Sequence, residues 1–193
     1  MRVTEVCFDL VVKSTRNELV LACAYPDRFL TEHDLQAWIV RRLISDLNAA
    51  SDNAEVGIHC QPRYLDGDGR LSIEPDIVVF NKGEYSIDPS GELAPRKGFT
   101  FWGSSIAIEL KLFRGNRTGD VTLCLRDIRK LAELRSIHYS CEQRFRFWPL
   151  FCVYSRGQIP ENLRSAIEFE GAEQEVKVLM VAENEAYTAN QAR

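Results

Sequence analysis

The sequence lacks the features of membrane and exported proteins. No window approaches the roughly 18 uninterrupted apolar residues that a membrane-spanning helix requires. The first ten residues contain Glu5 and Asp9, where a signal peptide would be uniformly apolar. No internal repeat, low-complexity tract or linker rich in Pro, Gly and Ser divides the chain. We therefore expect no membrane partner, a cytoplasmic location and a single domain over residues 1–193.

The motifs of several enzyme classes are also absent. The sequence contains no GxSxG, Walker A or GxGxxG motif, so it lacks the residues on which acyl-transfer enzymes, P-loop proteins and dinucleotide-binding proteins depend. The six cysteines lie far apart, with no CxxC pair and no histidine at zinc-ligand spacing. The three histidines form neither HExxH nor HxH. We interpret the cysteines as reduced core residues and assign the histidines no catalytic role.

What the sequence does contain is the composition of a globular protein with uneven charge. Hydrophobic residues make up 45% and charged residues 27%, which excludes a disordered chain, a collagen-like repeat and a bare coiled coil. The formal net charge is −4, yet residues 114–146 contain 8 basic and 4 acidic side chains. Because polyanion binding depends on local potential, this segment is either a nucleic-acid-binding face or a solvated helix face.

Hydrophobic periodicity predicts alternating helices and strands. Residues 1–30 fit a strand or a helix equally well and are left open. Pro160 is expected at the first position of its helix. The other expected segments, in chain order, are a helix capped by Thr31 and running to about Asn48, a hairpin of strands 55–65 and 71–80, a long loop, a strand at 104–113, a helix from Asp120 to about Tyr139, a strand at 147–154, a short helix, a strand at 176–182 and a frayed tail at 183–193.

Three charged residues fall on the second and third of these strands. Glu109 and Lys111 alternate with apolar residues and therefore share one face of their strand. Asp76 follows Pro75 and interrupts an apolar run, so its carboxylate needs a partner. Two carboxylates and an ammonium group on neighbouring strands suit phosphodiester chemistry with a divalent metal, because Mg²⁺ prefers oxygen ligands and neutralises charge on phosphate.

The order Pro75-Asp76, then Glu109-Leu110-Lys111, resembles the PD-(D/E)XK motif of the restriction-endonuclease-like nuclease superfamily. The resemblance spans about residues 31–154 and implies an α/β fold. That fold has an αβββαβ core with a mixed central sheet flanked by helices, followed here by a C-terminal helix and strand. The resemblance also implies that Asp76, Glu109 and the Leu110 carbonyl bind Mg²⁺, with Mn²⁺ as substitute, and that Lys111 serves the attacking water.

The function implied is a metal-dependent nuclease with nucleic acid as its partner, DNA being the preferred substrate. An alternative is a non-catalytic subunit that keeps the fold and binds nucleic acid or protein. A third hypothesis is an accidental motif, in which Glu109 and Lys111 form an ion pair on an exposed sheet and Asp76 is a turn residue. A homodimer or larger complex would suit two-strand cleavage by analogy.

Further candidates surround this motif. Glu32 lies on the sheet-facing side of its helix and is either a third metal-site acid or a first-turn glutamate that interacts with the helix dipole. Gln36, one turn later, is a candidate for a water-mediated contact.

Two groups of basic residues are candidates for nucleic-acid binding. Arg126, Arg129 and Lys130 lie away from the apolar stripe of their helix, although Asp127 and Lys130 are also spaced to pair with each other. Arg96 and Lys97 lie in the long loop among aromatic residues, as in a surface that stacks bases.

Overall fold

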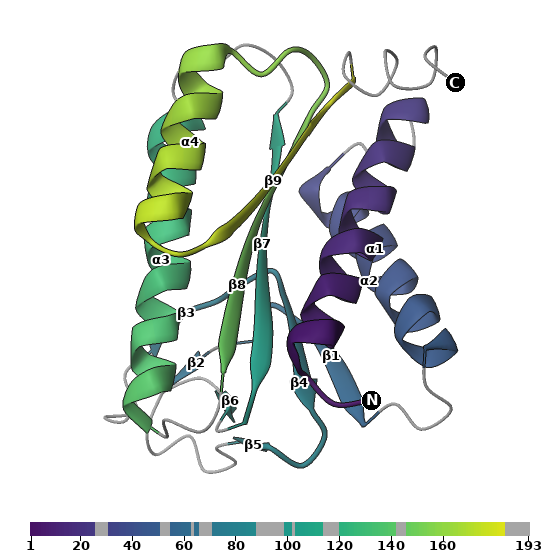
Figure 1. Ribbon diagram of the computed structural model, residues 1–193, viewed down its shortest axis with the longest axis vertical. Coiled ribbons are helices and arrows are strands. Elements are labelled where there is room, and N and C mark those ends of the chain that lie inside the picture. Colours follow the sequence, from purple (N-terminus) through teal and green to yellow (C-terminus); the bar gives the residue numbers. More distant parts are fainter. Residues whose placement is uncertain are drawn as a thin grey trace.

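The chain forms three layers, with a five-stranded sheet between two pairs of helices (Figure 1). The computed structural model describes residues 1–25, 31–50, 55–62, 64–65, 71–87, 99–101, 103–113, 120–141 and 146–183. The elements are α1 (Glu5–Ala24), α2 (Glu32–Ala49), β1 (Val56–Cys60), β2 (Tyr64–Leu65), β3 (Leu71–Ile73), β4 (Ile77–Asn81), β5 (Tyr85–Ile87), β6 (Phe99–Phe101), β7 (Ser105–Phe113), α3 (Asp120–Cys141), β8 (Phe147–Ser155), α4 (Glu161–Glu173) and β9 (Lys177–Ala182).

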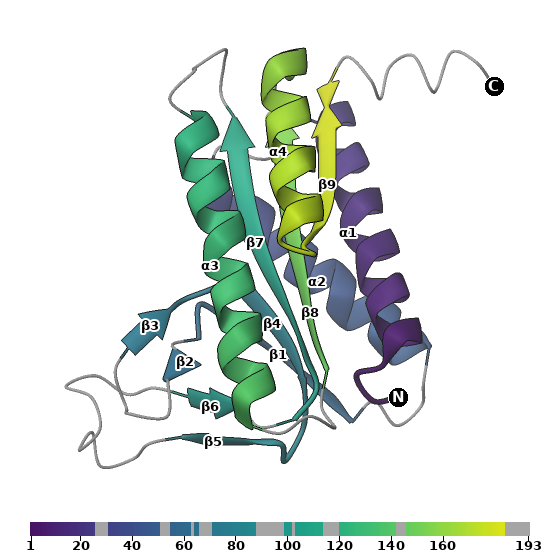
Figure 2. The same cartoon turned by 60° about the vertical axis from the view of Figure 1, so that its left-hand side comes forward.

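The main sheet is mixed and has the order β1-β4-β7-β8-β9. Strands β1, β4 and β7 are antiparallel neighbours, whereas β7, β8 and β9 run parallel. Helices α1 and α2 cover one face, and α3 and α4 cover the other (Figure 2). This arrangement confirms the predicted fold class, including the additional C-terminal helix and strand. No helix in the described part of the chain is long and apolar enough to cross a bilayer.

Residues 1–30, which periodicity left open, contain the helix α1. Thr4 caps it, since its hydroxyl accepts a hydrogen bond from the Cys7 amide. Cys7, Val11 and Leu19 are fully buried, and their spacing is that of one helical face. Val6 is 73% exposed, so the strand-like alternation of apolar residues near the start does not match burial.

The predicted helix after Thr31 is confirmed as α2. Thr31 and Asp34 form a capping box, in which each side chain accepts a hydrogen bond from the other residue's amide. The start of α4 is one residue later than predicted, because Pro160 is the N-cap and Glu161 the first helical residue. The tail at 184–193 lies outside the described residues.

The predicted pairing of strands 55–65 and 71–80 as a hairpin is confirmed, but the hairpin is divided between two sheets: β1 pairs with β4 in the main sheet, and β2 pairs with β3 in a second one. One expectation about the connections was wrong. The segment predicted as a long loop contains β5 and β6, which complete the second sheet in the order β3-β2-β6-β5. These strands have two or three residues each, too few for alternation to be read from sequence.

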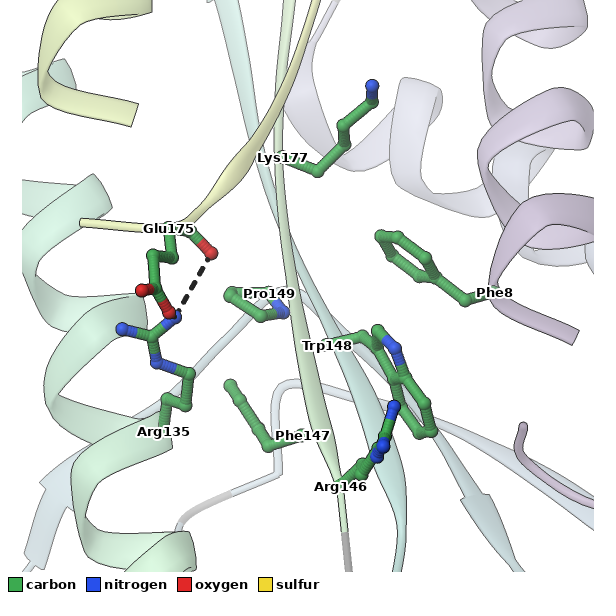
Figure 3. A pocket seen from close by; sticks show the side chains of 8 residues that line it. All are labelled: Phe8, Arg135, Arg146, Phe147, Trp148, Pro149, Glu175 and Lys177. Atoms are coloured by element: carbon green, nitrogen blue, oxygen red, sulfur yellow. Dashed lines mark hydrogen bonds and ion pairs between the residues drawn. The ribbon is translucent and has the colours of Figure 1, made fainter. Parts of the chain in front are cut away.

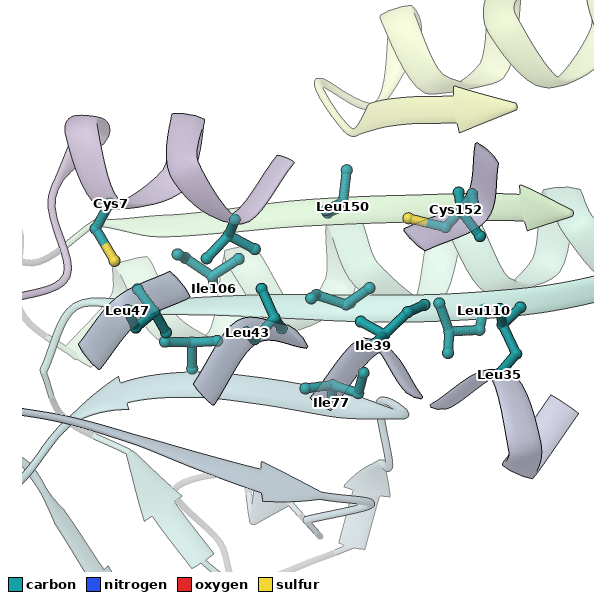
Figure 4. Close-up of a cluster of buried hydrophobic side chains, with 14 of the residues drawn as sticks. Cys7, Leu35, Ile39, Leu43, Leu47, Ile77, Ile106, Leu110, Leu150 and Cys152 are labelled. Carbon is teal, nitrogen blue, oxygen red and sulfur yellow. The ribbon is translucent and has the colours of Figure 1, made fainter. Parts of the chain in front are cut away.

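Strand β7 divides its side chains between two hydrophobic cores. Ile106 and Leu110 are fully buried in the core on the side covered by α1 and α2 (Figure 4), and so is Ile108. Ala107 and Phe113 pack into the second core beneath α3 and α4. Residues 109 and 111 share one face of β7, as predicted, and this face lies towards α3. Cysteines 7, 124 and 152 are buried and free, in agreement with their prediction as core residues, whereas the prediction is wrong for Cys60, which is exposed, and Cys23 is half-buried.

Gly171 lies where α4 packs tightly against the start of β9. A Cβ at this position would lie 2.4 Å from Val178 Cγ2 and 3.2 Å from the Val176 carbonyl oxygen. We expect Gly171→Ala to lower the free energy of unfolding by about 1–3 kcal/mol, because this overpacking outweighs the better helix propensity of alanine. Urea denaturation measures the change. Gly157→Ala is the control, since no atom lies within 4 Å of its added Cβ, and equal stability of both variants would contradict the prediction.

Candidate active site

The candidate site lies where β7 extends beyond its neighbour β4. The β4–β7 pairing ends at Ile77 and Ile108, and β7 continues to Phe113. The Leu110 amide donates a 2.7 Å hydrogen bond to Asp76 Oδ2, and the Leu112 amide donates a 3.3 Å hydrogen bond to Glu32 Oε2. Carboxylates thus bind the part of the β7 edge that β4 leaves open.

The backbone of Asp76 is held from two other elements. Its carbonyl oxygen accepts a 2.9 Å hydrogen bond from the Gln61 amide beyond β1, and a further one from Gln36 Nε2 on α2. Gln36 is only 7% exposed, so its predicted water-mediated contact is in fact a direct hydrogen bond. These contacts fix the direction in which the Asp76 carboxylate leaves the end of β4.

Glu109 and Lys111 each form an ion pair with α3. Lys130 Nζ donates to Glu109 Oε2 at 2.9 Å, and Lys111 Nζ lies 2.9 Å from Asp127 Oδ2. Lys111 Nζ is also 3.7 Å from Glu109 Oε1 and 3.8 Å from Glu32 Oε1. Glu109 is 4% exposed, which contradicts the hypothesis of an ion pair on an exposed sheet.

Asp127 is the site residue that the sequence analysis missed. The expected pairing between Asp127 and Lys130 is wrong, because each of these residues pairs with β7 instead. A signal was present: Asp127 lies three residues after Cys124 and four before Leu131, both fully buried. A carboxylate inside an apolar helical stripe needs a buried cation, and Lys111 provides it.

Burial and mutual repulsion raise the pKa of the carboxyl groups. Burial raises the pKa of Glu109 to about 7, with the Asp76 charge adding to the effect and Lys130 opposing it. Burial likewise raises the pKa of Asp76, despite the Leu110 hydrogen bond, and that of Glu32, despite Lys111. For Lys111, burial acts to lower the pKa, but the contact with Asp127 and the charges of Glu32 and Glu109 outweigh it and raise the pKa. Lys111 therefore stays charged.

The donor set fits a hard divalent cation. Four carboxylates, from residues 32, 76, 109 and 127, lie around three basic side chains, from residues 111, 126 and 130, so their formal charges sum to −1. Within the described ranges, no group of three or more His, Cys, Asp or Glu side chains is placed to hold a metal. Asp76 and Glu109 would thus need a backbone ligand, and the Leu110 carbonyl points to the same strand edge as its amide. Glu32 faces Lys111 and Leu112, so the geometry gives no support for it as a third ligand.

The predicted basic residues of α3 line a groove of about 500 Å³ beside the site. Arg126 is 69% exposed and lies 3.5 Å from Asp127 Oδ1. Arg129 is 62% exposed and binds both carboxylate oxygens of Glu170 on α4, at 2.8 and 3.1 Å. Lys130 lines the groove and donates a hydrogen bond to Glu109 in the candidate site. Arg96 and Lys97 lie outside the described residues.

No protein-family model and no curated protein matches the sequence. The fold, in contrast, resembles solved structures of NucC. The NucC of P. aeruginosa ATCC27853, in a cAAA-bound form, matches with a TM-score of 0.52 and 10% identity over 94% of this chain and 77% of that chain. The cAAA-bound NucC of E. coli MS115-1 matches with a TM-score of 0.51 and 10% identity over 91% of this chain and 75% of that chain. At this identity the likeness establishes the arrangement of helices and strands alone.

Proposed function

We propose that the protein is a divalent-metal-dependent nuclease that hydrolyses phosphodiester bonds, with DNA as its preferred substrate. The observation that carries the proposal is the convergence of Asp76, Glu109 and Lys111 at the open edge of β7. Two segments that are distant in the sequence, the residue before β4 and strand β7, meet there in the order that the PD-(D/E)XK motif requires. The excess of carboxylates over basic side chains and the raised pKa values of Asp76 and Glu109 support an Mg²⁺ or Mn²⁺ site.

The side chains divide the work between them. Asp76, Glu109 and the Leu110 carbonyl would hold the ion, which when bound supplies charge that activates water and stabilises the phosphate. Lys111 remains protonated, so it donates hydrogen bonds that orient the attacking water instead of removing its proton. Asp127 holds the Lys111 ammonium group in place, and Lys130 lies where a phosphate in the groove would approach Glu109.

A plasmid nicking assay beside a single-strand cleavage assay tests the proposal. We expect cleavage with Mg²⁺ or Mn²⁺ and none with excess chelator. Direct conversion of supercoiled to linear plasmid would favour a homodimer or larger complex. Metal-independent cleavage would contradict the proposal, and absence of both Mn²⁺ binding and cleavage would favour the non-catalytic subunit.

Metal affinity is expected to rise with pH, because Glu109 must lose its proton to bind a cation. With a pKa of about 7, the charged fraction, and hence the affinity, rises roughly tenfold between about pH 6 and about pH 8. Calorimetric titration of Mn²⁺ measures this change. Titrations at about pH 7 in two buffers of different ionisation enthalpy should show release of roughly half a proton. A flat affinity with no proton release would contradict a charged Glu109 ligand.

A further inference from the structure

A second pocket, of about 230 Å³, lies at the start of β8 (Figure 3). It forms because β9 begins at Lys177, opposite Leu150, and leaves the first three residues of β8 without a neighbour on that side. The pocket is lined by Phe8, Arg135, Arg146, Phe147, Trp148, Pro149, Glu175 and Lys177.

This pocket is separate from the candidate active site. Phe147 pairs with Ser105, whereas Glu109 and Lys111 lie four and six residues further along β7. At about 3.3 Å per residue, these offsets correspond to about 13 and about 20 Å along the sheet. The two sites therefore lie towards opposite ends of the same strands.

One wall of the pocket is aromatic. Phe8 on α1 and Trp148 on β8 stack with ring centroids 6.3 Å apart and an interplanar angle of 22°. Both side chains are only partly buried although they border the first core. Partly exposed rings beside cations form a surface on which a flat heteroaromatic ring can stack.

The charge of the pocket is positive. Its three basic residues face one acid, and that acid is occupied: Arg135 Nη1 lies 2.6 Å from Glu175 Oε2 and donates to the Glu175 carbonyl at 3.2 Å. The structure pairs neither Arg146 nor Lys177 with a carboxylate among the residues that it describes. Two cations therefore remain for an anionic ligand.

The backbone of Glu175 adds to this argument. Glu175 has φ of 50°, a left-handed conformation that favours glycine, in the turn that follows α4. A glutamate in this position keeps a carboxylate beside Arg135, so Arg135 is held at the pocket wall.

We propose that this pocket binds one nucleotide unit, with its base against the Phe8–Trp148 wall and its flanking phosphates near Arg146 and Lys177, which lie at opposite ends of the pocket (Figure 3). The unit belongs either to a free mononucleotide or to a single strand of nucleic acid, since the recognised chemistry is the same. A volume of about 230 Å³ is below the roughly 300 Å³ at which pockets for drug-sized ligands begin, so the pocket encloses the base and the rest of the nucleotide must extend outwards. The proposal does not depend on nuclease activity.

Binding without metal tests the proposal. We would titrate AMP and a fluorescein-labelled ten-nucleotide single strand into the full chain carrying Asp76→Asn, with chelator present. Trp148→Leu is expected to weaken binding about tenfold through loss of stacking. The double variant Arg146→Gln/Lys177→Gln should weaken strand binding and reduce the slope of log K against log salt by about 1.4, the value for two phosphate contacts with a single strand.

A matched double variant controls for general electrostatics. Lys13→Gln/Arg16→Gln removes the same charge from two exposed positions on α1 that do not line the pocket. Binding of AMP that is lost only in the pocket variants supports the proposal with a free nucleotide as ligand. Binding of the strand alone, with the same losses, supports it with a strand as ligand. Equal losses in the control, or no binding of either probe, would overturn it.

Discussion

Asp76→Asn is expected to abolish metal-dependent cleavage while leaving the fold intact. Asparagine keeps an oxygen that can accept the 2.7 Å hydrogen bond from the Leu110 amide, but it removes the negative charge that a divalent cation requires. Loss of about 4 kcal/mol of transition-state stabilisation corresponds to roughly a thousandfold lower rate. In this variant we expect both the heat of Mn²⁺ binding, measured by calorimetry, and plasmid cleavage, measured by the nicking assay, to be lost.

Asp76→Ala separates the two roles of this residue. It should be as inactive as Asp76→Asn but less stable by about 1–3 kcal/mol, because the Leu110 amide loses its acceptor. Urea denaturation without metal distinguishes the variants. Full activity in either variant would refute the metal site, whereas equal stability of the two would show that the Leu110 hydrogen bond contributes nothing to folding.

Lys111→Met is expected to damage both stability and activity. Lys111 is 19% exposed, and its ammonium nitrogen lies within 3.8 Å of the carboxylates of Glu32, Glu109 and Asp127. Its removal leaves these charges facing one another, at a cost of about 3–5 kcal/mol. The nicking rate should fall by at least about a hundredfold, since the water loses its hydrogen-bond donor.

The stability loss in Lys111→Met should depend on pH in a defined direction. Burial raises the pKa of Glu109 to about 7, so lowering the pH from about 8 to about 5 protonates Glu109 and reduces the difference in the free energy of unfolding between the variant and wild type. Denaturation at both pH values measures this change. Lys130→Met is the control, with a smaller loss expected, because Lys130 is 24% exposed and forms one ion pair. A stability difference between Lys111→Met and wild type that increases at low pH would contradict the proposed role of Lys111 beside Glu109.

Hydrophobic periodicity predicted the helices and strands that are long enough for the spacing of their apolar residues to be recognised. Strands β7 and β8, with nine residues each, and helices α2 and α3 were placed within a few residues. The alternation in β7 also predicted correctly that Glu109 and Lys111 share a face. Strands β5 and β6 were missed because three residues do not establish alternation.

The partners across the site could not be predicted for a different reason. Whether Lys130 meets Asp127 on its own helix or Glu109 on β7 depends on the rotation of α3 above the sheet. Local spacing favours the first pairing, while packing of Cys124, Ile128 and Leu131 into the second core imposes the second. Sequence spacing carries no information about that rotation.

The open edge of β7 gives the proline before Asp76 a structural meaning. If β4 were longer by two residues in the same register, Asp76 would face Glu109 and Pro75 would face Leu110. Proline has no amide hydrogen to continue the ladder, so strand pairing stops where the carboxylate is needed. In this fold the proline ends β4 early. The Asp76 carboxylate then accepts the hydrogen bond from the Leu110 amide that a backbone carbonyl of a longer strand would accept.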